Sequence, residues 1–412
     1  MNCHLVAVIA FLAGSWLLHT LSAILDVLRA PPRVPPEFAD VFDPPAYARG
    51  LAYRRASARL SVIADTCGTG LLLAAILLGG FAWLDRAVRA LGLSPLPTGL
   101  CYLGAVALAA SLSGLPFDAW RTFGVEARFG FNKTTVATFV RDRLVGLALS
   151  VLLGAPLVAG VLLLLDRAGS AAWLWCWALV TLFSLGVTYV APTWILPLFN
   201  TFTPLEEGRL RRAIETFARR AEFEVGGIFV VDGSRRSTKS NAFFTGLGRR
   251  KRIALFDTLV RDHAEAEIVA VLAHEVGHAK CGHIRKGLAG SVLRTGLLFF
   301  LMSLFLDSPG LSEAFGMAQP TAYAGLVFFL LLYTPISLLL GVAANWISRR
   351  REFEADRFSA RTTGDPAALA SALKRLSVTN LSDLTPHPLT VWLEYGHPPV
   401  LARLRALAEF AK

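Results

Sequence analysis

The chain has 412 residues, of which 54% are hydrophobic and only 17% are charged, and its formal net charge is +11. Long uncharged runs recur along it, so the composition excludes an ordinary soluble protein and predicts a polytopic membrane protein that is mainly α-helical. The positive charge does not indicate nucleic-acid binding, because Arg and Lys gather in particular loops and form no basic stripe interleaved with aromatic residues.

Seven apolar stretches are long enough to cross a bilayer as helices. They lie at residues 4–27, 60–84, 98–117, 144–165, 172–196, 288–306 and 322–346. The first, third and fifth loops and the C-terminal tail are rich in Arg and Lys, whereas the other loops hold only Arg86, Arg89 and Arg167. This asymmetry predicts an N-terminus outside and a C-terminus in the cytoplasm, together with the odd-numbered loops.

Two features depart from this simple pattern. Asp65 and Arg294 lie inside predicted spans, where each side chain either snorkels toward the cytoplasmic interface or lines a polar cavity between helices. The first loop is predicted to be extended rather than helical, because it contains the pairs Pro31-Pro32, Pro35-Pro36 and Pro44-Pro45.

The fifth loop, residues 197–287, is predicted to be a soluble module with a small β-sheet. The segment from Thr203 to Glu206 has the pattern of a capping box with proline at the first helical position, which predicts the start of an amphipathic helix. Short β-like runs follow at 227–232, 241–245 and 252–256. The edge strand of such a sheet, next to a metal, can bind an extended peptide by strand addition.

The same loop contains His274-Glu275-Val276-Gly277-His278, an H-E-x-x-H. An apolar stripe at helical spacing surrounds it, and Asp262 with Glu265 predicts a capped helix start. On a helix His274 and His278 share a face and can bind one zinc ion. Glu275 then lies beside the water that completes the zinc coordination, where it can act as general base.

A catalytic zinc ion needs a third protein ligand, and the tail supplies a candidate. On a helix Glu352 and Asp356 share a face, while Glu354 points away. Glu352 is therefore predicted to be the third zinc ligand, and Asp356 is predicted to accept a hydrogen bond from a ligand imidazole and fix its tautomer. His283 lies about 140° around the helix from His278 and is predicted to be structural.

Two histidines of the tail, His387 and His397, each precede a proline. A histidine in this position is either a turn residue or, on the correct side of the membrane, a donor to the oxyanion that forms during peptide hydrolysis. The residues alone do not decide between these two roles.

Several longer segments make the chain recognisable. Besides the H-E-x-x-H, they are residues 126–133, 197–205, 240–244, 251–259, 352–356 and 397–404. With these segments the chain resembles the type I CAAX prenyl proteases, intramembrane zinc metalloproteases that include the yeast a-factor-converting enzyme and the animal prelamin A protease. The first hundred residues match this family only in hydropathy.

The resemblance implies seven transmembrane helices around a large water-filled chamber, capped on the cytoplasmic side by the protease module. It also implies one zinc ion per chain, bound by His274, His278 and Glu352, with Glu275 as the base.

The resemblance further implies roles in substrate binding and catalysis. Asn241 and Ala242 would lie on the edge strand that binds the substrate backbone, and His397 and Arg403 would stabilise the transition state and hold the site together. The implied substrates are C-terminally prenylated CAAX peptides, cut before the last three residues.

The chain also departs from the family pattern. Lys239 replaces a histidine that is common in Ser-His-Ser-Asn-Ala versions, and Gly396 replaces a serine before His-Pro-Pro. Arg strongly outnumbers Lys and the loops are short, which suggests a bacterial member. The expected location is then the inner membrane, whereas a eukaryotic member would lie in the endoplasmic reticulum membrane.

The patterns divide the chain into residues 1–196 with five spans, 197–287 with the protease module, 288–346 with two spans, and 347–412 with the third ligand. The expected function is that of a membrane zinc endopeptidase whose partners are the lipid bilayer and a peptide or protein, prenylated or not. One alternative is a quality-control protease of the heat-shock type that cuts damaged membrane proteins. A catalytically silent scaffold or transporter is the other alternative, and the complete set of site residues argues against it.

Overall fold

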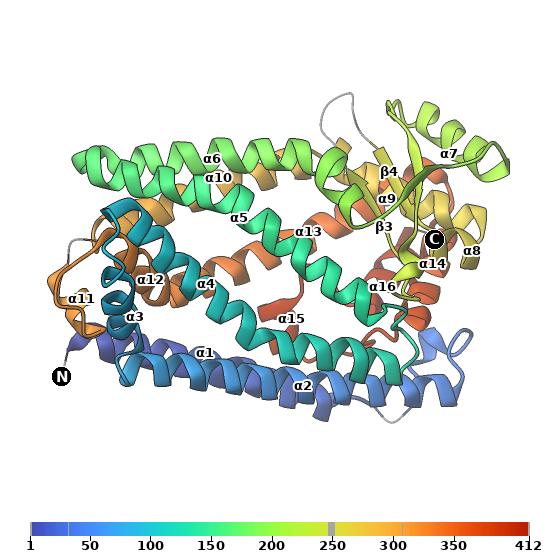
Figure 1. Ribbon diagram of the computed structural model, residues 1–412. Helices are drawn as coiled ribbons and strands as arrows, with labels where there is room; N and C mark the ends of the chain where they lie inside the picture. The colour runs from blue at the N-terminus through green and yellow to red at the C-terminus, as the bar shows by residue number, and fades with distance from the viewer. Residues whose placement is uncertain (1, 32, 246–251, 307, 411–412) are drawn as a thin grey trace.

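The computed structural model describes residues 2–31, 33–245, 252–306 and 308–410. Most of these residues lie in helices, as predicted, and the long helices run lengthwise from the end that holds the N-terminus to the end that holds the sheet and the C-terminus (Figure 1). Pro32 and Lys251, which belong to two of the sequence patterns above, lie outside the described residues.

Five helical segments in the described part of the chain are long and apolar enough to cross a membrane. They are built on α1 (Cys3–Arg29), α2 (Pro44–Leu77), α4 (Pro95–Ala119), α5 (Val136–Arg167) and α6 (Ala172–Val190). A sixth candidate is a pair of helices, α12 (Ala322–Leu332) and α13 (Thr334–Thr363), which are bent by 54° at the break between them.

The prediction of seven spans is not confirmed. Residues 288–303 of the sixth predicted span lie in α10 (His283–Ser303), which is not among the helices that meet the hydropathy of a span within the described residues. Lys286 and Arg294 lower the hydropathy of α10, and the helix ends at Ser303, before the predicted span does.

The prediction of an extended first loop is wrong from residue 44 onward. Helix α2 begins there, with Pro44 and Pro45 in its first turn. Backbone N–H groups in the first turn make no hydrogen bond within the helix, so the missing N–H of proline costs nothing there. The side chain of Asp43 caps the helix by accepting a hydrogen bond from the backbone N–H of Ala46 at 2.6 Å. Helix α2 ends at Leu77, and the left-handed Gly79 separates it from α3 (Gly80–Arg89).

A four-stranded sheet follows the five long helices in the chain. It consists of β1 (Phe202–Pro204), β2 (Ile228–Val231), β3 (Ala242–Thr245) and β4 (Arg252–Phe256) in the order β1-β2-β4-β3. Strands β2 and β4 are parallel, and the other two pairs are antiparallel. The three predicted strands are confirmed, and the order of the strands places β3 at an edge of the sheet.

The predicted capping box at Thr203 is wrong, because these residues form β1. Thr203 pairs with Val230, and its hydroxyl donates a hydrogen bond to the carbonyl of Val230 at 3.3 Å. The amphipathic helix begins later, as α7 (Arg209–Arg220). The gain from pairing with β2 outweighs the local preference for a helix cap, which is worth only about 1 kcal/mol.

Helix α9 (Glu265–Lys280) packs against the sheet through a core of fully buried side chains. These are Ile214, Ile253, Leu255, Leu259, Ile268 and Leu272. Its cap differs from the prediction by two residues, because the carboxylate of Glu267 accepts a hydrogen bond from the backbone N–H of Ala264 at 3.0 Å. The packing holds α9 in place at the sheet end of the molecule.

The remaining helices are short connections or pack at the ends of the molecule. They are η1 (Pro36–Phe38), η2 (Trp120–Glu126), η3 (Gly169–Ala171), η4 (Ala191–Ile195), η5 (Leu196–Leu198), η6 (Gly233–Arg235), α8 (Asp257–Asp262), α11 (Pro309–Ala314), α14 (Pro366–Thr379), α15 (Pro388–Glu394) and α16 (Val400–Phe410).

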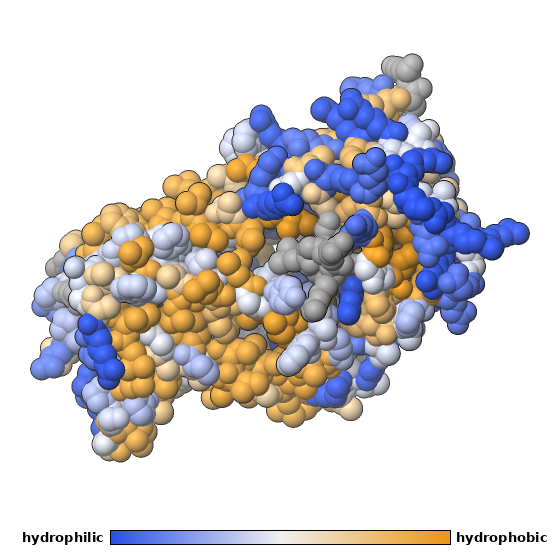
Figure 2. All heavy atoms as spheres, turned by 90° about the horizontal axis from the view of Figure 1, so that it is seen from above, coloured by the Kyte–Doolittle hydropathy of each residue, from blue (hydrophilic) through white to orange (hydrophobic). Residues whose placement is uncertain are grey.

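The surface divides into an apolar and a polar part. Figure 2 shows hydrophobic residues over the long helices and hydrophilic residues gathered toward the end with α7 and the sheet. Exposed leucines on the helices, such as Leu152, Leu182 and Leu339, contribute to the apolar part. Such an apolar surface is expected where helices contact lipid.

Candidate active site

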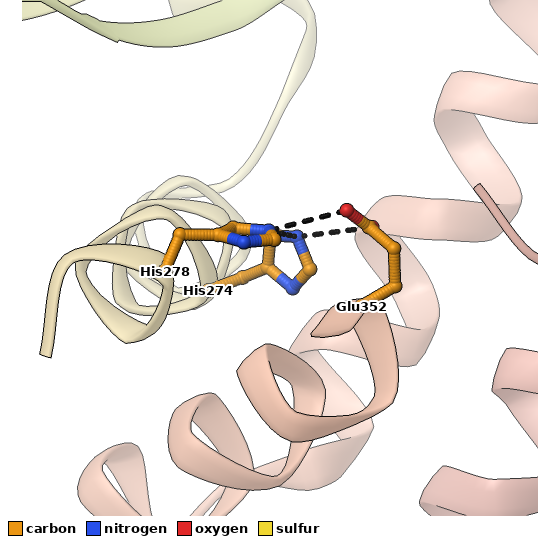
Figure 3. Close-up of side chains that lie close together, drawn as sticks. All are labelled: His274, His278 and Glu352. Carbon is orange, nitrogen blue, oxygen red and sulfur yellow. Dashed lines mark hydrogen bonds and ion pairs between the residues drawn. The ribbon is translucent and has the colours of Figure 1, made fainter. Parts of the chain in front are cut away.

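The site forms where α9 and α13 lie against each other. Helix α9 directs His274 and His278 toward α13, which presents Glu352 (Figure 3). The Nε2 atoms of the two histidines are 3.2 Å apart. Carboxylate oxygens of Glu352 lie 3.4 Å from Nε2 of His274 and 3.2 Å from Nε2 of His278. The structure thus brings together the three residues that the sequence predicts as metal ligands.

These distances fit a bound divalent metal ion. With zinc–ligand bonds of about 2.0–2.1 Å and tetrahedral angles, neighbouring ligand atoms lie about 3.3 Å apart. Two imidazole nitrogens and a carboxylate are also a donor set that catalytic zinc sites use. The Oε2 atom of Glu352 is buried and accepts no well-aligned hydrogen bond from the described residues, although Nδ1 of His397 lies 2.8 Å from it, and such an oxygen can bind a metal.

Small residues let α9 and α13 approach closely. A Cβ atom at Gly277 would lie 3.1 Å from both the Cα of Ala355 and the Cβ of Phe358. The buried hydroxyl of Ser359 donates a hydrogen bond to the carbonyl of Ala270 at 2.7 Å, directly between the helices. The distance from Glu352 to the two histidines depends on this contact.

Asp356 and Arg403 support His274. Nδ1–H of His274 donates to Asp356 at 2.8 Å, as the sequence predicts for a residue that fixes a ligand tautomer. Arg403 on α16 donates to both carboxylate oxygens of Asp356, at 2.6 and 2.8 Å. Burial by itself lowers the pKa of Arg403, but the hydrogen bonds and charge of Asp356, together with the charge of Glu352, raise the pKa above its usual value. The guanidinium therefore stays charged in the interior.

His278 has a different set of neighbours. Its Nδ1 lies 3.0 Å from Nδ1 of His283, and Nε2 of His283 lies 2.9 Å from a carboxylate oxygen of Glu354. The predicted angle between His278 and His283 is wrong, because it assumes a continuous helix. Helix α9 ends at Lys280, and the left-handed Gly282, with φ 72°, turns the chain so that His283 begins α10 beside His278. This glycine is the signal in the sequence that could have indicated the turn.

Glu275 is half-buried and faces a cavity of about 320 Å³ beside the ligands. The residues that line the cavity are Glu275, His278, His283, Ile284, Ser348 and Arg351. A substrate carbonyl and a water molecule can enter a space of this size next to Glu275.

The two tail histidines, His387 and His397, have different surroundings in the structure. Nδ1 of His397 lies 2.8 Å from Oε2 of Glu352, without the geometry of a hydrogen bond, and its side chain is 74% exposed. His387 instead caps α15, where its Nδ1 accepts a hydrogen bond from the backbone N–H of Leu389 at 3.2 Å. His397 is therefore the tail histidine that lies at the candidate site.

Two family models match consecutive parts of the chain. The model described as CAAX prenyl protease N-terminal, five membrane helices, covers residues 25–201, and the model of peptidase family M48 covers residues 204–411. The chain belongs to the CAAX prenyl protease family. It is therefore an integral, multi-pass membrane protein and a metallopeptidase, as the H-E-x-x-H and the apolar spans predicted.

Similar proteins and a solved structure support this family over nearly the whole chain. CAAX prenyl protease 1 homolog from Oryza sativa subsp. japonica is 39% identical over 311 residues, which cover 75% of this chain and 73% of that protein. CAAX prenyl protease 1 from Saccharomyces cerevisiae is 33% identical over 403 residues, which cover 91% and 88%. The crystal structure of S. mikatae Ste24p matches with a TM-score of 0.94 at 30% identity and covers 99% of each chain.

In this member of the CAAX prenyl protease family, the two residues predicted to bind the substrate backbone lie at the start of the edge strand. Ala242 begins β3, which pairs with β4 and contacts α9, and the backbone carbonyl of Asn241 accepts a hydrogen bond from the N–H of Phe256 at 3.0 Å. Nζ of Lys239, two residues earlier, lies 2.8 Å from the hydroxyl of Tyr53 and 3.1 Å from Glu126. These contacts tie the beginning of β3 to the helices.

Proposed function

We propose that this protein is a zinc endopeptidase that cuts peptides held in or beside the membrane and binds one zinc ion per chain. The observation that carries the proposal is the cluster of His274, His278 and Glu352, with Glu275 facing the adjoining cavity. Membership in an M48 family supports a metal at this place, and the donor set favours zinc.

A bound zinc ion would polarise the peptide carbonyl and lower the pKa of the attacking water. Glu275 takes the proton from that water and then passes it to the leaving amine as general acid. His397 donates a hydrogen bond to the oxyanion, for which its exposed ring beside Glu352 is suitably placed. Asp356 keeps Nδ1 of His274 protonated, and Arg403 keeps Asp356 charged.

The substrate backbone adds to the free edge of β3 at Asn241 and Ala242, with the scissile bond directed toward Glu275. The sheet order and the contact between β3 and α9 support this arrangement. Related proteins from rice, yeast and human are named CAAX prenyl proteases, and we extend their substrate class, C-terminally prenylated peptides, to this chain.

The helices surround a water-filled chamber, and the protease module lies on the cytoplasmic side with the C-terminus. Within the five long helices only 6–11% of the most apolar window is buried inside the structure, as expected of helices that contact lipid on one face and an open interior on the other. The distribution of Arg and Lys among the loops supports the orientation. The proposed parts remain residues 1–196, 197–287, 288–346 and 347–412.

The test is cleavage of a farnesylated CAAX peptide by the purified full-length protein in detergent, next to an unprenylated peptide of the same sequence. We expect cleavage before the last three residues of the farnesylated peptide and loss of cleavage after treatment with a chelator. Equal cleavage of both peptides would reject prenyl specificity and favour general proteolysis of membrane proteins. If the protein binds metal but cleaves neither peptide and no unfolded membrane protein, the proposal that it is an active endopeptidase is contradicted.

Two variants test the proposed base, Glu275, and the proposed metal ligand, Glu352, separately. Glu275→Ala removes the proton acceptor, so turnover falls by at least about 100-fold while metal stays bound. Glu352→Ala removes a ligand, so both metal and turnover are lost. Metal content measured on the same preparations distinguishes the two, and normal cleavage by Glu275→Ala would show that the mechanism is wrong.

A further inference from the structure

His278 differs from other ligand histidines in what its second nitrogen faces. A metal-binding histidine commonly donates this N–H to a carboxylate, a carbonyl or water, as His274 does to Asp356. Nδ1 of His278 instead faces Nδ1 of a second imidazole, that of His283, at 3.0 Å. The ring of His283 is almost fully buried, with 4% of its side chain exposed.

The position of every proton in this contact follows from the chemistry of imidazole. Nε2 of His278 is the atom that faces His274 and Glu352, so in the proposed metal site Nε2 binds the metal and Nδ1 carries the proton. Nδ1 of His283 must then accept that proton's hydrogen bond, which leaves the proton of His283 on Nε2. This N–H points at Glu354, 2.9 Å away, and a carboxylate is an acceptor.

We propose that His283 and Glu354 are positioning residues that fix the tautomer and the ring orientation of His278 for metal binding. The inference rests on the proposed zinc site. Glu354 holds the proton of His283 on Nε2, and His283 thereby offers Nδ1 as the acceptor that His278 requires. The chain of hydrogen bonds runs from the metal face of His278 to the surface, where the side chain of Glu354 is 52% exposed.

One turn and one helix face bring the members of this hydrogen-bonded chain together. The left-handed Gly282 brings His283 back against His278 immediately after α9 ends. Glu354 lies two residues beyond Glu352 on α13, and therefore points away from the ligand face, toward the start of α10. Helices α9, α10 and α13 thus meet in one hydrogen-bonded chain behind the ligand.

A second metal ion is the competing interpretation, because ligand atoms of Cys281, His283 and Glu354 lie within 4.8 Å of one another. A metal on Nε2 of His283 would displace the proton through which His283 donates its hydrogen bond to Glu354. The half-exposed Glu354 and the existing contact between the two imidazoles favour the hydrogen-bonded chain. Metal stoichiometry decides between the two arrangements.

The experiment measures the zinc dissociation constant of the full-length protein in detergent by competition with a chromophoric chelator. We expect His283→Leu to weaken zinc binding by about 10–100-fold, the usual effect of removing the partner of a ligand histidine. His283→Asn keeps an acceptor near the position of Nδ1, so it should recover most of the lost affinity. Glu354→Gln should weaken zinc binding several-fold, because the amide oxygen still accepts but lacks the charge that fixes the tautomer.

Glu394→Gln is the matched control, because Glu394 is also an exposed carboxylate beside a histidine, His19, but lies outside the metal site. It should bind zinc as tightly as the parent protein. The absorption spectrum of the cobalt-substituted protein gives a second readout, and we expect it to change in His283→Leu and not in Glu394→Gln.

The outcomes separate this inference from the function on which it rests. If the parent protein binds no metal, the proposed zinc site itself fails. If the parent protein binds one zinc ion and Glu354→Gln, His283→Asn and His283→Leu all bind it equally well, only the positioning role is overturned. Two zinc ions per parent chain, reduced to one by Cys281→Ala, would replace the hydrogen-bonded chain by a second metal site. If His283→Leu does not fold, Glu354→Gln against Glu394→Gln decides the question.

Discussion

The two histidines of the site are supported in different ways on its two sides. The side chain of His274 is 7% exposed and faces Asp356, which Arg403 binds from α16 through two hydrogen bonds. The side chain of His278 is 21% exposed and faces His283, beyond which Glu354 reaches the solvent. One side is a closed network of buried charges, and the other is a short hydrogen-bonded chain that ends at the surface.

This difference indicates which side stabilises the fold. Arg403 connects the last helix to α13 in the interior, where a charge that loses its partner is strongly unfavourable. The hydrogen bond from the neutral ring of His283 to Glu354 ends on a half-exposed carboxylate and contributes about 1 kcal/mol, because water competes for that carboxylate. Substitutions on the His274 side should therefore unfold the protein, whereas substitutions on the His278 side should act on the metal and leave the fold intact.

The largest effect is expected for Arg403→Met. The substitution removes the only cation that the structure's described residues place on the buried carboxylate of Asp356 and leaves it with the hydrogen bond from His274, which should lower the free energy of unfolding by about 3–5 kcal/mol. Denaturant unfolding in detergent measures the change. Arg405→Met is the matched control, because Arg405 lies two residues further on the same helix, is 71% exposed and pairs with Glu37. It should cost no more than about 1 kcal/mol, and equal losses in both variants would remove the distinction between buried and exposed pairs.

An intermediate effect is expected for Gly277→Ala, which acts between the two sides. The added Cβ would lie only 3.1 Å from Cα of Ala355 and Cβ of Phe358, so α13 must shift, the free energy of unfolding should fall by about 1–3 kcal/mol and zinc binding should weaken as Glu352 moves away. Gly290→Ala on α10 provides the comparison, because its Cβ would meet no atom within 4 Å. That variant should be neutral or gain up to about 1 kcal/mol from helix propensity. Unchanged stability of Gly277→Ala would contradict the close approach of α9 and α13.

The smallest effect on stability is expected for Glu354→Gln. Its free energy of unfolding should stay within about 1 kcal/mol of that of the parent protein, because the side chain is half in solvent. The same denaturant titration as for Arg403→Met gives the measurement. A loss as large as that of Arg403→Met would show that both sides of the site support the fold equally.

Much of the site was predictable because its parts are local. His274 and His278 lie one helical turn apart, and so do Glu352 and Asp356, so the period of the helix sets which face each pair shares. The usual partner of a ligand histidine predicted a hydrogen bond from one of the two imidazoles to Asp356, and the structure shows that the donor is His274. The partner of His278 was missed, because the turn at Gly282 breaks the helical period on which the prediction for His283 rested.

Local patterns failed where a distant segment or a rigid residue decided the structure. Thr203 has a helix-capping pattern, but β2, more than twenty residues later in the chain, supplies a strand partner. Pro44 and Pro45 contributed to the prediction of an extended loop, but in the first turn of α2 they cost the helix no hydrogen bond. In both cases the residues permit two structures, and their surroundings select one.

The amino-acid sequence was sufficient to identify the membrane class, the three strands, the family and the three residues proposed as metal ligands, because hydropathy, short periodicities and motifs depend on neighbouring residues. The tertiary structure alone decided that α9, α13 and α16, far apart in the chain, meet at one point and that Arg403 lies against Asp356 there. Burial of apolar surface is non-directional, so a pattern shows which face of a helix is buried but not which helix covers it. That choice depends on the shapes of the contacting surfaces, such as the missing side chain of Gly277 that lets α13 approach.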